Sequence, residues 1–422
     1  GLFMTSVQSH LQQLNGSRVM NFRSSKKYLS CALAVMLLAG CSSSRKTTQP
    51  PPPAPTPKQV EQPVKKTEVV HEKPEKKDVN IGLMLPLNLQ QQIQMFDDTS
   101  GNATPDYNNL STLQFAEGAL LAADSLKYLG INVNLHIAET PADSFALWRL
   151  WRQNNFVKCE AVIASVPSSY IPAVARLSFN NKQSLILTQA SNTNFKTSNE
   201  HVYMLSPSTH TQCMVAAKEI AARFPDSKFI LLARDVKPDK DIAQIFKENL
   251  PAKQLKHFIT SNFYPDSVCK ILKSENAVLI IASSAEAYVN TILNQVNECI
   301  EKPAFAFGLP TWENFESIDF NILKNLRIAF FTSTYLDYHA ASTKSFRNSF
   351  INHYKTEPLL AAFQGYEAVM EYVKSNAVHG TFKSNYLPTL KIKFVKDAAN
   401  GIKENQGINL IEIKDYTLVP ME

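Results

Sequence analysis

The chain has 422 residues, a formal net charge of +6 at pH 7 and 44% hydrophobic residues. This length is enough for more than one domain, since domains usually have about 100 to 200 residues. Part of the positive charge lies before residue 79, and no basic stripe with stacking aromatic residues is present, so the sequence argues against a nucleic-acid partner.

Residues 20–41, MNFRSSKKYLSCALAVMLLAGC, follow the order of a secretory signal peptide. A basic stretch comes before an apolar run over residues 29–38, and small residues come before Cys41. The apolar run is shorter than the about 20 residues that a membrane-spanning helix needs, so a transmembrane anchor is the weaker interpretation. Residues 1–19 lack this order, and we expect them to be upstream translation.

The end of the signal, Leu38-Ala39-Gly40-Cys41, resembles the lipobox of bacterial lipoproteins. The resemblance implies lipidation of Cys41, and a plain secretory signal with an incidental cysteine is the alternative. Several acyl chains would hold the protein on a membrane, because each buried methylene contributes about 0.8 kcal/mol. Serines and no acidic residue follow Cys41, which by analogy with such lipoproteins favours the periplasmic face of the outer membrane over the inner membrane.

Residues 42–78 are rich in Pro, Lys, Glu and Thr and contain almost nothing that could form a core. We expect a disordered, extended tether here. At about 3.1 Å per residue in polyproline geometry, it would reach on the order of 100 Å. A spacer is favoured over a specific Pro-rich ligand for a partner.

From residue 79 onward, short apolar runs alternate with segments of helical periodicity. The runs fit strands buried on both faces, and the periodic segments fit helices. The predicted strands are 79–87, 133–138, 161–164, 184–188, 228–233, 255–260, 277–282, 304–307 and 326–333. The predicted helices are 113–128, 143–154, 169–178, 210–224, 240–250, 266–274, 285–300, 342–354 and 358–375. Such alternation favours parallel sheets, and the length favours two of them. Residues 391–395 and 408–419 alternate apolar and polar residues, which predicts a closing antiparallel hairpin.

Four cysteines lie in the part predicted to fold: Cys159, Cys213, Cys269 and Cys299. No CxxC pair or paired histidine spacing is present, which argues against zinc. A Cys269–Cys299 bridge is one alternative in an oxidising periplasm, but the apolar context of all four favours buried free thiols. The sequence also lacks the GxSxG, GK[ST], HExxH and GxGxxG motifs. We therefore expect a protein that is not an enzyme and has no metal or cofactor.

The order of these segments resembles the type I periplasmic solute-binding proteins, the leucine-isoleucine-valine receptor branch in particular. The motifs that carry the resemblance are IGLMLPL, FAEGALLAADSLKYLGINVNLHI, AVIASVPSSYIPAVA, SLILTQASNTNF and FQGYEAVMEYV. The resemblance implies an α/β fold of two doubly wound parallel-sheet lobes, joined by three crossovers, with a ligand in the cleft between them. It implies that lobe 1 takes residues 79–206 plus 333–388 and that lobe 2 takes 207–332 plus 389–422.

Hydroxyl groups follow the strand predicted at 161–164, on Ser165, Ser168 and Ser169. A helix is predicted to begin there, and the free N–H groups of a helix N-terminus attract a carboxylate or phosphate. The alternative is that Ser168 only caps its own helix. The resemblance places Ser168 at the position of the family's carboxylate-holding serine, and it places Ala190, Ser191 and Asn192 in a second loop that grips the ligand.

The corresponding loops of the other lobe contain Ser283, Ser284, Thr311 and Trp312. Amino-acid receptors of the family usually have an aromatic and an acidic residue there, which hold the ammonium group. No acid is clearly in register in this chain, which argues against a free amino acid. Trp312 and Glu313 are candidates for the roles of the missing aromatic and acidic residues. The alternative is that Trp312 packs within the protein or contacts a partner. An irregular insertion over residues 88–109 is expected at the rim of the cleft, where it would be functional or disordered, and it lacks the spacing of a calcium loop.

Together these features predict a non-catalytic, solute-binding lipoprotein on the periplasmic side of a membrane. Its ligand is expected to be small and polar, amino-acid-like or carboxylate-bearing, and bound for transport or sensing. The alternative is an outer-membrane lipoprotein that regulates a cell-wall (peptidoglycan) synthase through its surface, which the long tether and the missing ammonium site both suit. The expected partners are the ligand, a membrane through Cys41, and a transporter or a cell-wall synthase.

Overall fold

The computed structural model describes residues 77–89, 107–153, 155–189, 199–260, 263, 265–377, 388–397, 401–415 and 417–421. The predicted signal peptide, Cys41 and nearly all of the tether lie outside these residues, as does most of the insertion expected at 88–109. Within the described part, no helix combines the length and the apolar character needed to cross a membrane.

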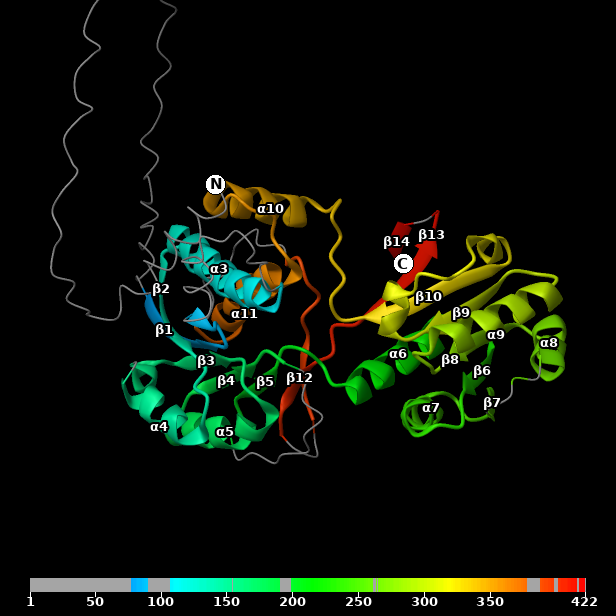
Figure 1. Ribbon diagram of the computed structural model, residues 1–422, viewed down its shortest axis with the longest axis horizontal. Helices are drawn as coiled ribbons and strands as arrows, with labels where there is room; N and C mark the ends of the chain where they lie inside the picture. The colour runs from blue at the N-terminus through cyan, green and yellow to red at the C-terminus, as the bar shows by residue number, and fades with distance from the viewer. Residues whose placement is uncertain are drawn as a thin grey trace, which may run out of the picture. The chain divides into compact units, whose positions relative to one another are not determined.

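Two separate sheets, each of seven strands in the described residues, organise the protein (Figure 1). The first has the order β11-β12-β5-β4-β3-β1-β2. Its neighbouring strands are parallel, except that β11 is antiparallel to β12. The strands are β1 (Lys77–Leu85), β2 (Ile131–Glu139), β3 (Ala161–Ala164), β4 (Ser184–Leu187), β5 (Val202–Met204), β11 (Phe394–Lys396) and β12 (Lys403–Asn405).

Helices cover both faces of this sheet, and together they form lobe 1. On one face lie α3 (Tyr107–Tyr128) and α11 (Leu360–Tyr372), and on the other lie α4 (Ser144–Gln153) and α5 (Ile171–Asn180) (Figure 1). A further helix, α10 (Ala341–Tyr354), packs its aromatic side chains against α11. Because both faces are covered, the inner strands β3 and β4 are apolar along nearly their whole length, which is the pattern that predicted them.

Two glycines let α3 and α11 cross at close range. A Cβ atom on Gly118 of α3 would lie 1.9 Å from the carbonyl oxygen of Ala362. A Cβ atom on Gly365 of α11 would lie 1.9 Å from the carbonyl oxygen of Phe115. Each obstacle is backbone and cannot rotate away, so the crossing requires glycine at both positions.

The second sheet has the order β14-β13-β10-β9-β8-β6-β7 and forms lobe 2 with its helices. Its strands are β6 (Lys228–Ala233), β7 (Leu255–Ile259), β8 (Ala277–Ile281), β9 (Ala304–Gly308), β10 (Leu326–Thr332), β13 (Asn409–Lys414) and β14 (Thr417–Pro420). Its helices are α6 (Thr209–Arg223), α7 (Lys237–Asn249), α8 (Pro265–Ser274) and α9 (Glu286–Cys299). Strands β6 to β10 pair in parallel, whereas β13 is antiparallel to β10 and β14 is antiparallel to β13. The expectation of two parallel-dominated α/β lobes is therefore confirmed.

A disulfide joins α8 to α9 between Cys269 and Cys299, whose Cα atoms are 5.9 Å apart. The preference for free thiols was therefore wrong for this pair. Sequence spacing does not show that α8 and α9 pack side by side, which is what brings the two sulfurs together. Cys159 and Cys213 are buried free thiols, as expected.

The C-terminal part of the chain divides differently from the expected boundary at residue 389. Strands β11 and β12 form one hairpin, which joins lobe 1 because β12 pairs with β5. Strands β13 and β14 form a second hairpin, which joins lobe 2 through β10. The alternating segments predicted to pair with each other thus belong to different sheets, and the chain enters lobe 2 for the last time after Asn405.

Candidate functional site

Each sheet reverses its strand order at one point, and the loops at that point are the first place to look for a site. In lobe 1, β1 lies between β2 and β3, and in lobe 2, β6 lies between β7 and β8. In open α/β sheets, ligands bind outside the carboxyl ends of the strands at such a switch point. The loops that follow β3 and β1, and those that follow β8 and β6, therefore define the two candidate edges.

Ser165, the first residue after β3, joins three loops of the lobe 1 edge. Its hydroxyl accepts a hydrogen bond of 3.0 Å from Gln189 Nε2, and its carbonyl oxygen accepts one of 2.8 Å from Thr140 Oγ1. Ser165 is only 8% exposed, so it orders the edge more than it presents a group to solvent. Sequence reasoning missed Gln189 and Thr140, because each lies about 25 residues from Ser165 and only the parallel sheet brings them together.

Ser168 and Ser169 are exposed and begin a helical turn, η2 (Ser168–Tyr170), that continues directly into α5. The N-cap residues are Pro167 for η2 and Tyr170 for α5, and neither position has a side-chain cap. Ser168 therefore does not cap its own helix, which was the alternative interpretation. Ala190, Ser191 and Asn192 lie outside the described residues, so their predicted role stays a prediction.

In lobe 2, the loops after β8 and β9 meet through their hydroxyl groups. Thr311 Oγ1 donates to Ser284 Oγ at 3.1 Å, and both residues are exposed. Ser283 is fully buried, and its hydroxyl accepts from the backbone N–H of Ala285 at 3.2 Å. Ser284 and Thr311 are thus the predicted residues that offer hydroxyl groups at this edge, while Ser283 shapes the loop.

For Trp312 the structure shows packing, which was one alternative to a ligand contact. Its side chain is 1% exposed, its Nε1 donates to the carbonyl oxygen of Ser283 at 3.1 Å, and its ring stacks on Phe315 at 6.0 Å. A Cβ atom on Gly308 would collide with the ring. Trp312 therefore packs the η3 turn (Pro310–Asn314) against β9, and a contact with ligand stays a prediction.

Arg234 is a charged residue at the lobe 2 edge that sequence reasoning did not select. It follows β6 directly, and it donates from Nε and Nη2 to the carboxylate of Asp239 at 2.7 and 3.2 Å. Its guanidinium also lies 5.9 Å from the ring of Tyr288. The hydrogen bond that Arg234 donates to Asp239 raises the pKa of Arg234, so the guanidinium is charged. The sequence signal was an arginine at a strand end, five residues before an acid in the first turn of a helix.

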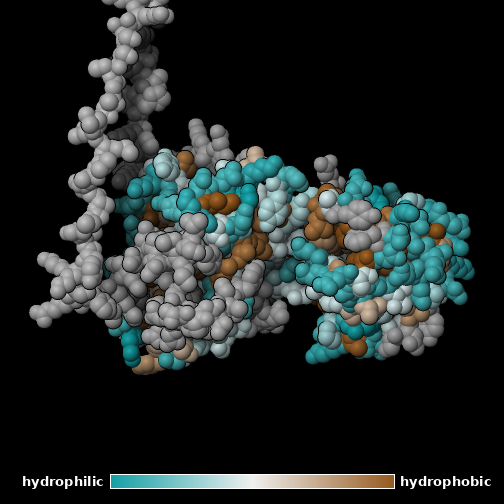
Figure 2. All heavy atoms as spheres, turned by 45° about the horizontal axis from the view of Figure 1, so that its top comes forward, coloured by the Kyte–Doolittle hydropathy of each residue, from teal (hydrophilic) through white to brown (hydrophobic). Residues whose placement is uncertain are grey.

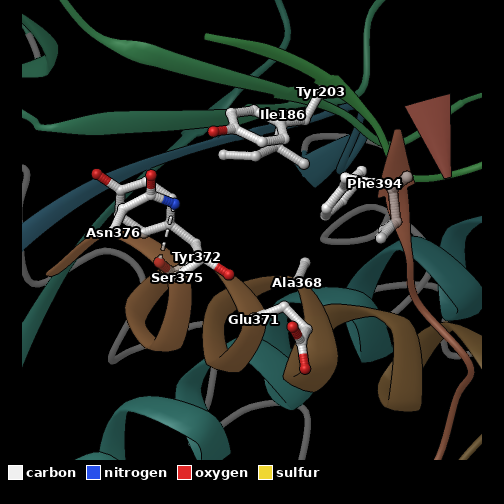
Figure 3. Close-up of a pocket in the computed structure, with 9 residues that line it drawn as sticks. Ile186, Tyr203, Ala368, Glu371, Tyr372, Ser375, Asn376 and Phe394 are labelled. Carbon is white, nitrogen blue, oxygen red and sulfur yellow. Dashed lines mark hydrogen bonds between the residues drawn. The ribbon is translucent and has the colours of Figure 1, made fainter. Parts of the chain in front are cut away.

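A small crevice lies elsewhere in lobe 1, between the sheet and α11 (Figure 3). Ile186 and Tyr203 line it from the strands, and Ala368 and Tyr372 line it from the helix. Its lining residues do not include Ser165, Ser168 or Ser169. It is therefore separate from the candidate edge of lobe 1. Across the described residues, no group of three His, Cys, Asp or Glu side chains could hold a metal ion.

A scan against protein-family models and a search of curated protein sequences both find no match. Among solved structures, a putative branched-chain amino acid ABC transporter from Rhodospirillum rubrum aligns with 82% of this chain and 100% of its own, with a TM-score of 0.58 and 14% identity. A branched-chain amino acid ABC transporter periplasmic ligand-binding protein from Burkholderia xenovorans aligns with 82% of this chain and 94% of its own, with a TM-score of 0.50 and 13% identity.

This chain has the type I periplasmic binding protein fold. Full-length LpoA from Haemophilus influenzae is also similar, over 82% of this chain and 59% of its own, with a TM-score of 0.51 and 11% identity. At these identities the likeness is one of fold, and the type I fold supports more than one kind of function.

Proposed function

We propose that this protein is a non-catalytic periplasmic binding protein that holds a small polar ligand between the carboxyl edges of its two lobes, for transport or sensing. The observation that carries the proposal is that both edges present exposed hydroxyl groups, on Ser168 and Ser169 in lobe 1 and on Ser284 and Thr311 in lobe 2. Lipidation of Cys41 and the tether would keep it on the periplasmic side of the outer membrane.

The lobe 1 edge suits a carboxylate. The hydroxyl groups of Ser168 and Ser169 stand at the start of a continuous helical segment, where the first N–H groups have no intrahelical partner. Such N–H groups and the helix dipole both favour an anion. Two similar solved structures are described as branched-chain amino acid transport proteins, which supports a carboxylate-bearing ligand here.

Thermal unfolding of the chain from residue 42 onward, with L-leucine, short peptides, dicarboxylates and cell-wall fragments, tests the proposal. A ligand at 100 times its Kd stabilises the folded state by about 2.7 kcal/mol. We expect Ser168→Ala and Asn192→Ala to abolish that shift. Ser274→Ala, an exposed serine at the end of α8, is the matched control and should keep it. If no compound in a broad library shifts the unfolding temperature, that result contradicts the proposal.

A second candidate function is regulation of a cell-wall synthase through a protein surface. The observation that favours it is the exposed side of α4, where Phe145 is 72% exposed and Trp148 is 47% exposed. Arg149 lies 5.7 Å from the ring of Phe145, and Arg152 lies 3.9 Å from that of Trp148. Tryptophan and arginine are enriched at the energetic centres of protein interfaces. Figure 2 shows a face of the molecule that is mostly hydrophilic, with scattered hydrophobic patches.

Trp148→Ala separates the two functions. Under the second candidate, the affinity of this variant for the synthase falls at least tenfold. The reason is that a tryptophan at the centre of an interface contributes about 2 kcal/mol or more. It leaves the ligand-induced thermal shift unchanged, since α4 does not belong to either candidate edge. Exposed Tyr128→Ala, on α3, is the control. Unchanged capture by Trp148→Ala contradicts this candidate.

A further inference from the structure

Arg234 occupies the switch point of the lobe 2 sheet. Leu232 of β6 pairs with Ile281 of the adjacent strand β8. Arg234 and Ser283 each lie two residues beyond this pair, so they follow the ends of neighbouring strands at the same height. The loops from these strands lead into α7 and α9, whose N-cap residues are Val236 and Ala285 and have no side-chain cap. A cation with two uncapped helix N-termini beside it forms an environment that favours a negatively charged group.

Asp239 orients the guanidinium and leaves part of it available. Its buried carboxylate receives Nε and Nη2 of Arg234 in a bidentate arrangement, which fixes the plane of the group. A guanidinium has five N–H donors, and within the described residues Nη1 has no hydrogen-bond partner. The Arg234 side chain is 34% exposed, so these remaining donors can reach a ligand.

Three acidic residues near the lobe 2 edge already have ion-pair or hydrogen-bond partners. Asp239 binds Arg234 itself, and Asp235 forms an ion pair of 2.8 Å with Lys240. Glu286, at the start of α9, accepts hydrogen bonds from the backbone N–H groups of Glu316 and Ser317 at 2.8 and 2.6 Å. Asp239 and Asp235 are thus paired with cations, and Glu286 is held through Oε1 by neutral donors, while Nη1 of Arg234 keeps free donors.

We infer that Arg234 binds an anionic group of the ligand, so that the ligand carries one anion for each lobe and is a small dicarboxylate or a similar dianion. The inference rests on the proposed function, because it assigns the end of the ligand that lobe 2 holds. A zwitterionic amino acid fits poorly, since its ammonium group would meet the guanidinium.

Calorimetric titration of the chain from residue 42 onward with succinate, glutarate, propionate and L-leucine tests the inference. We expect a dicarboxylate to bind more tightly than propionate, because propionate has only one anionic group. Arg234→Gln should weaken dicarboxylate binding at least tenfold and leave propionate unchanged. Arg234→Gln combined with Asp239→Asn should give the same loss without a buried unpaired carboxylate, which separates binding from folding.

Arg327→Gln is the matched control. Arg327 forms the same kind of bidentate pair, with Glu412 at 2.7 Å, but it lies at the amino end of β10. This variant should bind the dicarboxylate as the wild-type protein does. Tight binding of L-leucine without binding of a dicarboxylate would overturn the inference and leave the proposed function standing. Unchanged dicarboxylate affinity in Arg234→Gln overturns the inference alone, and no binding of any of the four compounds or of the wider library overturns both.

Discussion

Glu117 is a buried carboxyl group on α3, where the hydroxyl of Tyr354 donates to its backbone oxygen at 3.0 Å. Burial raises the pKa of Glu117 from 4.5 to about 8. Burial also raises the pKa of Glu367 on α11 to about 7, although hydrogen bonds from Thr389 oppose the shift. Both groups therefore fold in the protonated form at mildly acidic pH, and ionisation opposes folding.

The stability contributed by Glu117 is complete below its unfolded pKa of 4.5 and is lost as the pH rises through about 8. The loss is up to about 1.4 kcal/mol for each pH unit between the two values. Between pH 7 and 8, Glu117 is the main contributor of this pair. We expect Glu117→Gln to flatten the fall in unfolding free energy in that interval, measured by urea unfolding. The exposed Glu219→Gln should keep the wild-type slope, and a wild-type slope in Glu117→Gln would refute the assignment.

Single site residues were predictable where they directly follow a predicted strand. Ser165 and Ser284 follow short apolar runs that could be read directly as strands, so their place at a sheet edge followed from the sequence. Gln189 and Thr140 were not predictable, because their role depends on contacts with Ser165 across neighbouring strands. Packing was one alternative for Trp312, but the sequence does not show the space beside Gly308 that its ring fills.

At the scale of elements, the helices and parallel strands were predictable because burial on both faces leaves a continuous apolar run. The helix boundaries match within a few residues, apart from the early start of α3 at Tyr107 and of α7 at Lys237. Strand β5 was missed, since three residues carry too little pattern. The disulfide was not predictable, and neither was the division of the C-terminal strands into two hairpins that join different sheets. Each depends on which elements become neighbours.

The crossing of α3 and α11 gives a prediction at this scale. Gly118→Ala places a methyl group against the backbone of α11, so the two helices must separate. We expect a loss of about 1 to 3 kcal/mol in unfolding free energy, the usual cost of overpacking. Gly365→Ala should give a similar loss, because it meets the same crossing from the other helix. Lys127→Ala, exposed on α3, should change the free energy by about 0.5 kcal/mol or less. Equal stabilities of Gly118→Ala and Lys127→Ala would show that the crossing is loose.

At the scale of the whole molecule, hydrogen bonds link two of the chain segments that connect the lobes to each other, the one after β5 and the one at β12. Asn405 Nδ2 donates to the carbonyl oxygen of Leu205 at 3.0 Å. The buried carboxylate of Glu404, on β12 of lobe 1, accepts from the backbone N–H of Ser208 and from Thr211 Oγ1. Ser208 caps α6, whose apolar side chains belong to the core of lobe 2. One carboxylate of lobe 1 thus helps to hold the first turn of a lobe 2 helix.

Removing that carboxylate should loosen the start of α6 without unfolding either lobe. Hydrogen bonds to a charged group contribute about 1.5 to 3 kcal/mol, so Glu404→Ala should raise amide exchange in the first two turns of α6 by about tenfold or more. Hydrogen exchange followed by mass spectrometry measures this for each peptide. Glu357→Ala, which removes an ion pair with Arg347 inside lobe 1, should leave α6 unchanged. A rise of equal size in all helices of lobe 2 would mean that Glu404 stabilises the lobe as a whole, whereas a rise limited to α6 places the joint between the lobes at its N-terminus.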